Sequence, residues 1–155
     1  MLLHPRKLHN LSTEEALARV GQVALGRLVY YSRALPNIWP TTHFVDGDTI
    51  VINAHSDSDL GRALRASPLS PFVTAYEVDV FDSRHIGWCV VVTGPMEILT
   101  EEEIGHRDGL AALRAKIPGW AATEDLMLLG IRAEVVSGYE LGGELGVAQL
   151  EPETA

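Results

Sequence analysis

The sequence of 155 residues has one cysteine, two lysines and no long apolar run. Because Cys89 has no second cysteine to pair with, no internal disulfide can form, and we expect a protein of the reducing cytoplasm. No apolar stretch approaches the roughly 20 residues that cross a bilayer, so we expect no membrane partner. Basic residues near the start are not followed by an apolar segment, so we expect no secretory signal.

Positive charge is scarce as well. The formal net charge is −9, and the arginines are scattered rather than gathered into a basic stripe. Affinity for nucleic acid depends on Lys and Arg side chains that release counterions from phosphates, so we expect no nucleic-acid partner. The chain also lacks a Gly-rich phosphate loop, a nucleophile elbow and the ligand spacing of a zinc site, so we predict no metal site.

The composition that remains is that of one globular domain. Apolar residues make up 46% of the chain and charged residues 21%, which is ordinary for a folded protein. A chain of this length suffices for one compact core and is short for two. We therefore predict a single domain over residues 1–155, with its core at about 11–138 and a weakly ordered tail at about 144–155.

Three helices are predicted from capping signals. Ser12 and Glu15 have the spacing of a capping box, which begins a helix ending near Gly26. The acidic segment 56–59 precedes a short helix over 60–65. Thr100 and the glutamates after it begin a third helix, whose apolar side would carry Leu110, Leu113 and Ile117.

Strand-like segments fill most of the remaining sequence. They lie at 27–32, 38–45, 49–54, 72–79, 88–99 and 126–136. Residues 34–37 are expected to form a turn, and Asp46-Gly47-Asp48 predicts a hairpin. Residues 49–52 are apolar on both faces, which indicates an internal strand. Six strands joined by short turns favour a closed or nearly closed barrel, because closure removes exposed sheet edges. The predicted fold class is α+β and mainly β.

Several short strings occur in one order and spacing between about Leu11 and about Gly138. They are Leu11-Ser-Thr-Glu-Glu-Ala16, Gly26-Arg-Leu28, Trp39-Pro-Thr-Thr-His-Phe44, Val45-Asp-Gly-Asp-Thr-Ile-Val-Ile52, Ala75-Tyr-Glu-Val-Asp79 and Gly87-Trp-Cys-Val-Val-Val-Thr-Gly94. Taken together, they resemble the pyridoxamine 5′-phosphate oxidase-like family. The resemblance implies a six-stranded antiparallel split β-barrel with flanking helices.

The resemblance also implies a function. Members are homodimers that bind FMN in clefts between the subunits and act as oxidoreductases on small-molecule substrates, while relatives use deazaflavin and a few bind haem. The flavin ring would lie along Pro40–Phe44, the phosphate near Asn53–Arg62, and the second subunit would contribute its Trp88 strand. The cofactor-binding residues expected on this basis are Thr41, Thr42, His43, Asn53, His55, Ser58, Arg62, Trp88 and Cys89. No residue is assigned acid–base chemistry.

Two positions depart from the family pattern. Many flavin-binding members have a threonine at the position of Ala54 and a lysine at the position of Asp59. An acid in place of the lysine replaces attraction for a phosphate by repulsion. The alternative is therefore a dimeric barrel without flavin, which binds or transforms another small molecule in the cleft between subunits.

Single residues have competing interpretations. His43 and His55 suggest a metal or haem site, but without a third ligand they are more simply polar residues that line a wet cleft. Trp88 suits the core, a dimer interface or a cofactor contact. Cys89 is more often a small buried apolar residue than a nucleophile.

Overall fold

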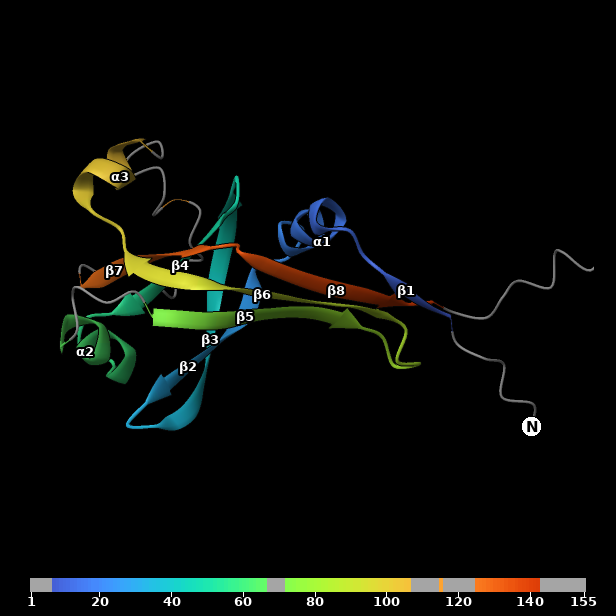
Figure 1. Ribbon diagram of the computed structural model, residues 1–155, viewed down its shortest axis with the longest axis horizontal. Coiled ribbons are helices and arrows are strands. Elements are labelled where there is room, and N and C mark those ends of the chain that lie inside the picture. Colours follow the sequence, from blue (N-terminus) through green and yellow to red (C-terminus); the bar gives the residue numbers. More distant parts are fainter. Residues whose placement is uncertain (1–6, 67–71, 107–114, 116–124, 143–155) are drawn as a thin grey trace, which may run out of the picture.

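The computed structural model describes residues 7–66, 72–106, 115 and 125–142, in which eight strands form one antiparallel sheet flanked by three helices (Figure 1). The strands are β1 (Leu8–Asn10), β2 (Leu25–Ser32), β3 (Leu35–Asp46), β4 (Thr49–His55), β5 (Phe72–Phe81), β6 (Gly87–Ile98), β7 (Leu126–Arg132) and β8 (Val135–Leu141). The helices are α1 (Thr13–Val20), α2 (Asp59–Ala66) and α3 (Glu101–His106). None of these helices is long and apolar enough to cross a membrane.

The sheet closes on itself. Its strand order is β1-β8-β6-β5-β2-β3-β4-β7, and β7 also pairs with β6. Six strands, β2 to β7, therefore complete a closed barrel, while β8 and β1 extend the sheet beyond it, alongside the first half of β6 (Figure 1). The predicted six-stranded antiparallel split barrel with flanking helices is confirmed.

The split in the barrel runs through β6. Its first half pairs with β8, from Gly87↔Leu141 to Thr93↔Val135, and its last residues pair with β7, from Met96↔Ile131 to Ile98↔Leu129. The change of partner falls at Gly94, where the chain passes from β7 to β8 across β6. A Cβ atom on Gly94 would lie 1.7 Å from the carbonyl oxygen of Arg132, so only glycine allows this approach.

Several predicted boundaries differ from the structure. The strand expected over 126–136 is two strands, because the chain leaves β7 at Arg132 and starts β8 at Val135. The turn expected at 34–37 is only the two residues 33 and 34, so Pro36 lies within β3. The first helix ends at Val20 rather than near Gly26, since β2 already begins at Leu25. The short strand β1 was not predicted.

Other expectations are confirmed. Ser12 and Glu15 form both hydrogen bonds of the capping box, at 3.2 and 2.8 Å. Strand β4 is internal and is paired with β3 and β7. The third helix begins after Thr100 as expected, but Leu110, Leu113 and Ile117 lie outside the described residues, as does the tail at 144–155.

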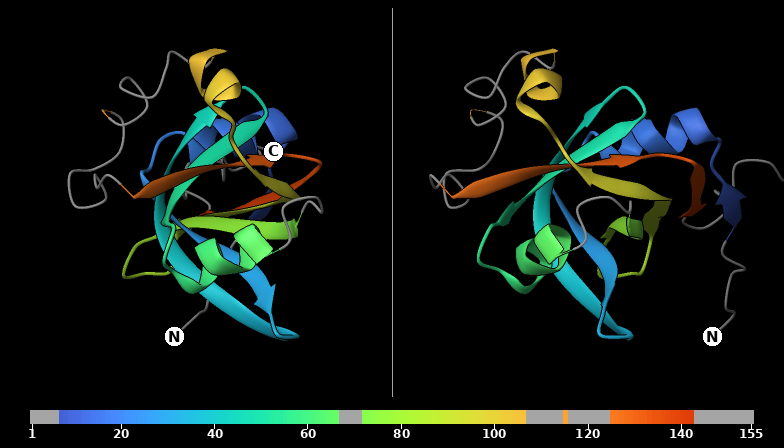
Figure 2. Two further views of the ribbon diagram at one scale, coloured as in Figure 1. Left: turned by 90° about the vertical axis from the view of Figure 1, so that its left-hand side faces the viewer. Right: turned by 60° about the vertical axis from the view of Figure 1, so that its left-hand side comes forward.

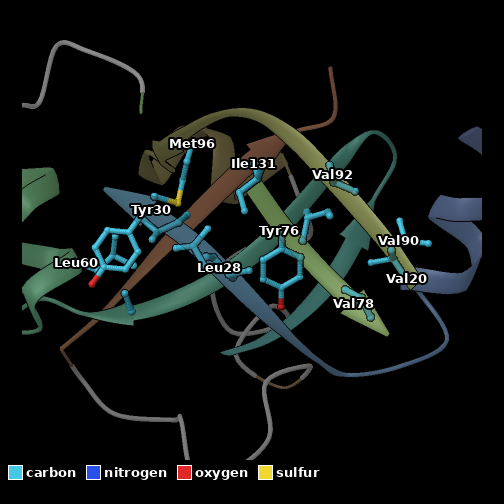
Figure 3. Packing of buried hydrophobic residues seen from close by; sticks show 14 of the residues in the cluster. Val20, Leu28, Tyr30, Leu60, Tyr76, Val78, Val90, Val92, Met96 and Ile131 are labelled. Atoms are coloured by element: carbon cyan, nitrogen blue, oxygen red, sulfur yellow. The ribbon is translucent and has the colours of Figure 1, made fainter. Parts of the chain in front are cut away.

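The barrel interior is filled by residues of alternating strands. Along β2, β5 and β6 every second side chain points inward, and Leu28, Tyr76, Val78, Val90 and Val92 are fully buried together (Figure 3). Residues Ala16 and Val20 of α1 and Leu60 and Leu64 of α2 complete this core. Burial of large side chains at about 1.5–3 kcal/mol each is what holds the two helices on the barrel.

A polar chain crosses this apolar core. The Nε2 atom of His43 lies 2.8 Å from the carbonyl oxygen of Val20, and Nδ1 lies 2.8 Å from the hydroxyl of Tyr76, which also lies 3.0 Å from the carbonyl oxygen of Thr41. A neutral imidazole protonated at Nε2 donates to Val20, and the one hydroxyl proton of Tyr76 is then shared between Nδ1 of His43 and the carbonyl oxygen of Thr41. His43 thus supplies a short hydrogen bond to the last carbonyl of α1, which otherwise accepts only the 3.5 Å bond from the N–H of Val23. Burial lowers the pKa of His43.

The close approach at Gly94 predicts a sharp effect of substitution. Gly94→Ala should lower the free energy of unfolding by about 2–4 kcal/mol, because both crowded groups are backbone and neither strand can retreat without breaking sheet pairs. Gly105→Ala is the matched control, since a Cβ on that glycine of α3 meets no atom within 4 Å. It should be neutral or stabilising by up to about 1 kcal/mol. Urea unfolding of both variants tests the difference, and equal stabilities would contradict it.

The buried histidine predicts a pH dependence. In the unfolded chain His43 titrates near pH 6.5, whereas its pKa in the folded chain is lower, so protons bind the unfolded chain more tightly below that pH. Stability should be complete above about pH 6.5 and fall as the pH drops. Between about pH 7.5 and pH 5.5 this histidine should contribute a loss of up to about 1.4 kcal/mol.

The measurement is urea unfolding at both pH values for the wild type and for His43→Gln. The variant should be less stable at either pH and should show the smaller pH dependence. Equal pH dependence in the two proteins would mean that His43 is not the titrating group.

Candidate functional site

A small pocket opens on the outer surface of the barrel where β3 runs beside β4. The strand alternation that points His43 and Ile52 inward points Thr42, Phe44, Val51 and Asn53 outward. These outward side chains line the pocket with Leu128 of β7, which pairs with Asn53. The gaps between these side chains add up to about 200 Å³ but leave no room for even a water molecule, so a ligand would lie against the mouth of the pocket or would need its side chains to move apart.

Two polar atoms in this pocket have no partner. Thr42 and Asn53 are each only 5% exposed, yet Oγ1 of Thr42 and Nδ2 of Asn53 make no hydrogen bond. Leaving such a group buried and unpaired costs about 1–3 kcal/mol, and the described part of the chain contains no other buried side-chain atom of this kind. A hydroxyl and an amide N–H₂ without partners, side by side on adjacent strands, are suited to hydrogen-bond a polar ligand.

The neighbouring Thr41 supports this arrangement. Its hydroxyl lies 3.2 Å from both the backbone oxygen and Oδ1 of Asn53. Oδ1 of Asn53 is therefore held on the β3 side, which leaves Nδ2 as the free end of the amide. Thr41 acts here by orienting Asn53.

His43 also lines the pocket, but its ring is bonded within the core and does not lie in a wet cleft. The residue is buried, and both ring nitrogens are already bonded, to Val20 and Tyr76. Ligation of a metal or haem iron by His43 would break one of these bonds. His55, at the end of β4, is exposed. Within the described residues no three His, Cys, Asp or Glu side chains are grouped so that they could hold a metal ion.

The junction of β4 and α2 carries the predicted phosphate residues, and their groups are engaged within the chain. The Ser58 hydroxyl donates to the carbonyl of His55 at 2.6 Å and accepts from the backbone N–H of Gly61 at 3.0 Å, which caps α2. Arg62 binds the carboxylate of Asp59 and the backbone oxygen of Asp57. A phosphate at this junction would have to compete with Asp59 for Arg62.

The two predicted residues of β6 lie on opposite faces of the strand. Trp88 is buried in the barrel core, with the Arg19 guanidinium of α1 5.9 Å from its ring centre. Cys89 points outward, and its Sγ lies 3.5 Å from Oε1 of Glu77. Burial and the carboxylate of Glu77 raise the pKa of the Cys89 thiol to about 11, so it is a poor nucleophile at neutral pH.

The structure thus divides the predicted residues into three groups. Thr41, Thr42, His43 and Asn53 lie together on β3 and β4, while His55, Ser58 and Arg62 lie at the start of α2. Trp88 and Cys89 lie on β6, which pairs with β5, β7 and β8 and not with β3 or β4. The pocket residues not among the predicted site residues are Phe44, Val51, Ile52 and Leu128. The alternation of β3 places Phe44 beside Thr42, but no local pattern places β7 next to β4.

Comparison with known proteins agrees with this architecture. The sequence profile of the family described as pyridoxamine 5′-phosphate oxidase matches residues 12–139. The uncharacterized protein Rv0080 of Mycobacterium tuberculosis is 28% identical over 137 residues, which cover 88% of this chain and 87% of that protein.

Solved structures share the fold. A FAD-binding protein of Mesorhizobium loti superposes with a TM-score of 0.70 at 20% identity, covering 90% of this chain and 100% of its own. The FAD and heme binding protein of Mycobacterium smegmatis superposes with a TM-score of 0.66 at 17% identity, covering 94% and 76%. With its closed barrel of six strands and a profile match over most of its length, the chain belongs to the pyridoxamine 5′-phosphate oxidase family.

Proposed function

We propose that this protein is a flavin-type oxidoreductase, using FMN or a deazaflavin, that acts on a small molecule as a cytoplasmic homodimer. The observation that carries the proposal is the pair of unpartnered, buried polar atoms, Oγ1 of Thr42 and Nδ2 of Asn53, in one outward pocket. The edge of a flavin ring carries hydrogen-bonding nitrogen and oxygen atoms, so it would satisfy both. The FAD-binding relatives of the same fold add support.

The residues of this chain would bind and orient the cofactor. When bound, a flavin supplies hydride or electron transfer. The Asn53 amide, fixed by Thr41, would donate to an acceptor on the ring edge, and the Thr42 hydroxyl would bond an adjacent atom. Phe44, Val51 and Leu128 would exclude water from those hydrogen bonds, which strengthens them.

An alternative function is favoured by a specific contact. Asp59 holds Arg62 in an ion pair where relatives offer a cation to the phosphate, and Ala54 is buried in the core without a hydroxyl. A barrel that binds a ligand without a phosphate would keep this arrangement unchanged. The alternative is a non-redox dimer that uses the Thr42–Asn53 pocket for another polar ring.

The homodimer is proposed from the outer face of the sheet. Strand register aligns Ile38, Val29, Ala75, Thr93 and Val135 in one row across β3, β2, β5, β6 and β8. Ile38 and Val135 are among the most exposed apolar residues, and a row of this kind is typical of a surface that another protein covers.

The same face carries the pocket. Thr42 pairs with Leu25 of β2, so the Thr42–Asn53 pocket lies on the same side of the sheet as that row. A second copy seated on the row would border the pocket and would close it toward solvent. Trp88, Val90 and Val92 of β6 point inward and belong to the core. Of the apolar residues between them, Val91 points outward and could contact a second subunit.

The flavin proposal predicts opposite effects on binding and stability. Thr42→Val keeps the side-chain shape and removes the unpaired hydroxyl, so the protein without cofactor should unfold at a higher temperature. If the hydroxyl contacts the flavin, the dissociation constant for FMN should rise by about 2- to 12-fold. Thr74→Val is the matched control: this buried threonine of β5 bonds the carbonyl of Gly94 at 3.4 Å and does not line the pocket.

The measurements are FMN fluorescence titration, with FAD as a second probe, and thermal unfolding of the three proteins. The control should lose stability and bind FMN as the wild type does. No visible flavin spectrum at saturating FMN or FAD would contradict the flavin proposal and favour the alternative. Unchanged FMN affinity in Thr42→Val would contradict the assigned contact.

The dimer proposal is tested by two substitutions on one strand. Ile38 and Leu35 of β3 are 67% and 66% exposed and point to opposite faces, because they are three positions apart in a strand whose side chains alternate. Ile38→Glu places a charge in the proposed interface and should dissociate the dimer, whereas Leu35→Glu should leave it intact. Light scattering during gel filtration measures both masses. A monomeric wild type at micromolar concentration would rule out the proposal.

A further inference from the structure

A second hollow is lined by residues of α2 and of the β2–β3 hairpin. These two elements are neighbours at one end of the molecule (Figures 1 and 2). The volume of the hollow is about 510 Å³, within the range of small-molecule sites. It shares no lining residue with the Thr42–Asn53 pocket. Its ligand can therefore differ from the cofactor.

One wall is a single face of α2. Asp59, Arg62, Ala63 and Ala66 follow at helical spacing and line the hollow, while Leu60 and Leu64 on the other face are buried in the core. Asp59 and Arg62 make the first half of this wall charged. Ala63 and Ala66 make the second half apolar, and their small side chains leave room beside the helix.

The opposite wall is the hairpin, and it carries an unusual turn. Arg33 and Ala34 both have positive φ, 52° and 61°, a combination that two-residue hairpins usually assign to Asn and Gly. Side chains with a Cβ are strained in this region. An arginine here is not explained by the needs of the turn.

Over the described residues, the side chain of Arg33 makes no hydrogen bond or ion pair, whereas Arg62 across the hollow is bonded to Asp59. Arg33 therefore brings an uncompensated positive charge to the hollow of a chain with net charge −9. Leu35 and Asn37 lie beside it, with an exposed apolar side chain and a side-chain amide.

We infer that this hollow binds a small organic anion with a compact apolar body, at a site separate from the flavin pocket. The guanidinium of Arg33 pairs with the carboxylate or phosphate group, and guanidinium groups bind such anions through two parallel hydrogen bonds. Leu35, Ala63 and Ala66 contact the apolar body. Because Asp59 neutralises Arg62, the hollow has a net charge near +1 and selects an anion over a cation.

Sodium benzoate is a suitable probe, with a carboxylate on an apolar ring. Titration followed by amide chemical shifts should give saturable changes at Arg33, Asn37 and Ala63, with a dissociation constant below about 1 mM. Benzylamine, the cationic counterpart, should cause none. Inorganic phosphate, which lacks the apolar body, should bind more weakly than benzoate. Raising the salt concentration should weaken benzoate binding, because the contact is ionic and partly exposed.

Two variants test the two halves of the site. Arg33→Asn should weaken benzoate about tenfold or more and should also raise the unfolding temperature, since asparagine tolerates positive φ. Ala63→Leu should narrow the hollow where the apolar body of the probe is expected to lie, and should weaken binding. The controls are Arg84→Asn, which makes the same charge change on the β5–β6 loop, and Ala18→Leu on an exposed position of α1. Both should bind benzoate as the wild type does.

The experiment is done without and with saturating FMN, which separates this site from the proposed cofactor site. Equal benzoate affinity in both states is expected. Benzoate binding in a protein that binds no flavin would support this site while the flavin proposal fails. The inference is overturned if benzoate does not bind, if benzylamine binds as well, if FMN displaces benzoate, or if Arg33→Asn keeps full affinity.

Discussion

The change of partner along β6 is the constraint on which the architecture depends. One strand cannot pair with β8 and β7 along the same edge unless the chain between them crosses it closely, and the crossing leaves no room for a side chain at Gly94. Closure at this point brings β7 back against β4. The pairing of Leu128 with Asn53, and with it one wall of the outward pocket, is therefore a consequence of how the barrel closes.

The pocket and the start of α2 differ in how their polar groups are satisfied. At α2, Ser58 and Arg62 have their groups bonded within the chain, so this segment is stable without a ligand. In the pocket, Thr42 and Asn53 each leave a buried group unpaired, which lowers stability unless something binds. Such a local cost in an otherwise consistent fold is typical of a functional site. Binding of the flavin ring at the Thr42–Asn53 pocket therefore has stronger physical support than binding of its phosphate at the start of α2.

Local sequence patterns correctly predicted the features that are determined by residues close together along the chain. The capping box at Ser12, the hairpin at Gly47 and the alternation of β5 each involve a few consecutive residues, and each is present. The division of 126–136 into two strands and the neighbour of Asn53 depend on contacts with distant β6 and β4, which no local pattern contains. His43 was expected in a wet cleft, but the direction of its side chain is set by Tyr76 and Val20 inside the barrel.

Strand β3 connects these features because its two faces do different work. Even-numbered Ile38 and Thr42 lie on the outer face with the apolar row and the pocket, whereas odd-numbered Trp39 and His43 serve the core. A slip of one residue against β2 would exchange the faces, burying the outer side chains and exposing the histidine. The two-residue turn fixes the register, and that task needs only positive φ at positions 33 and 34. Glycine or asparagine would fulfil it with less strain, so the charge of Arg33 is best explained by what it faces across the hollow.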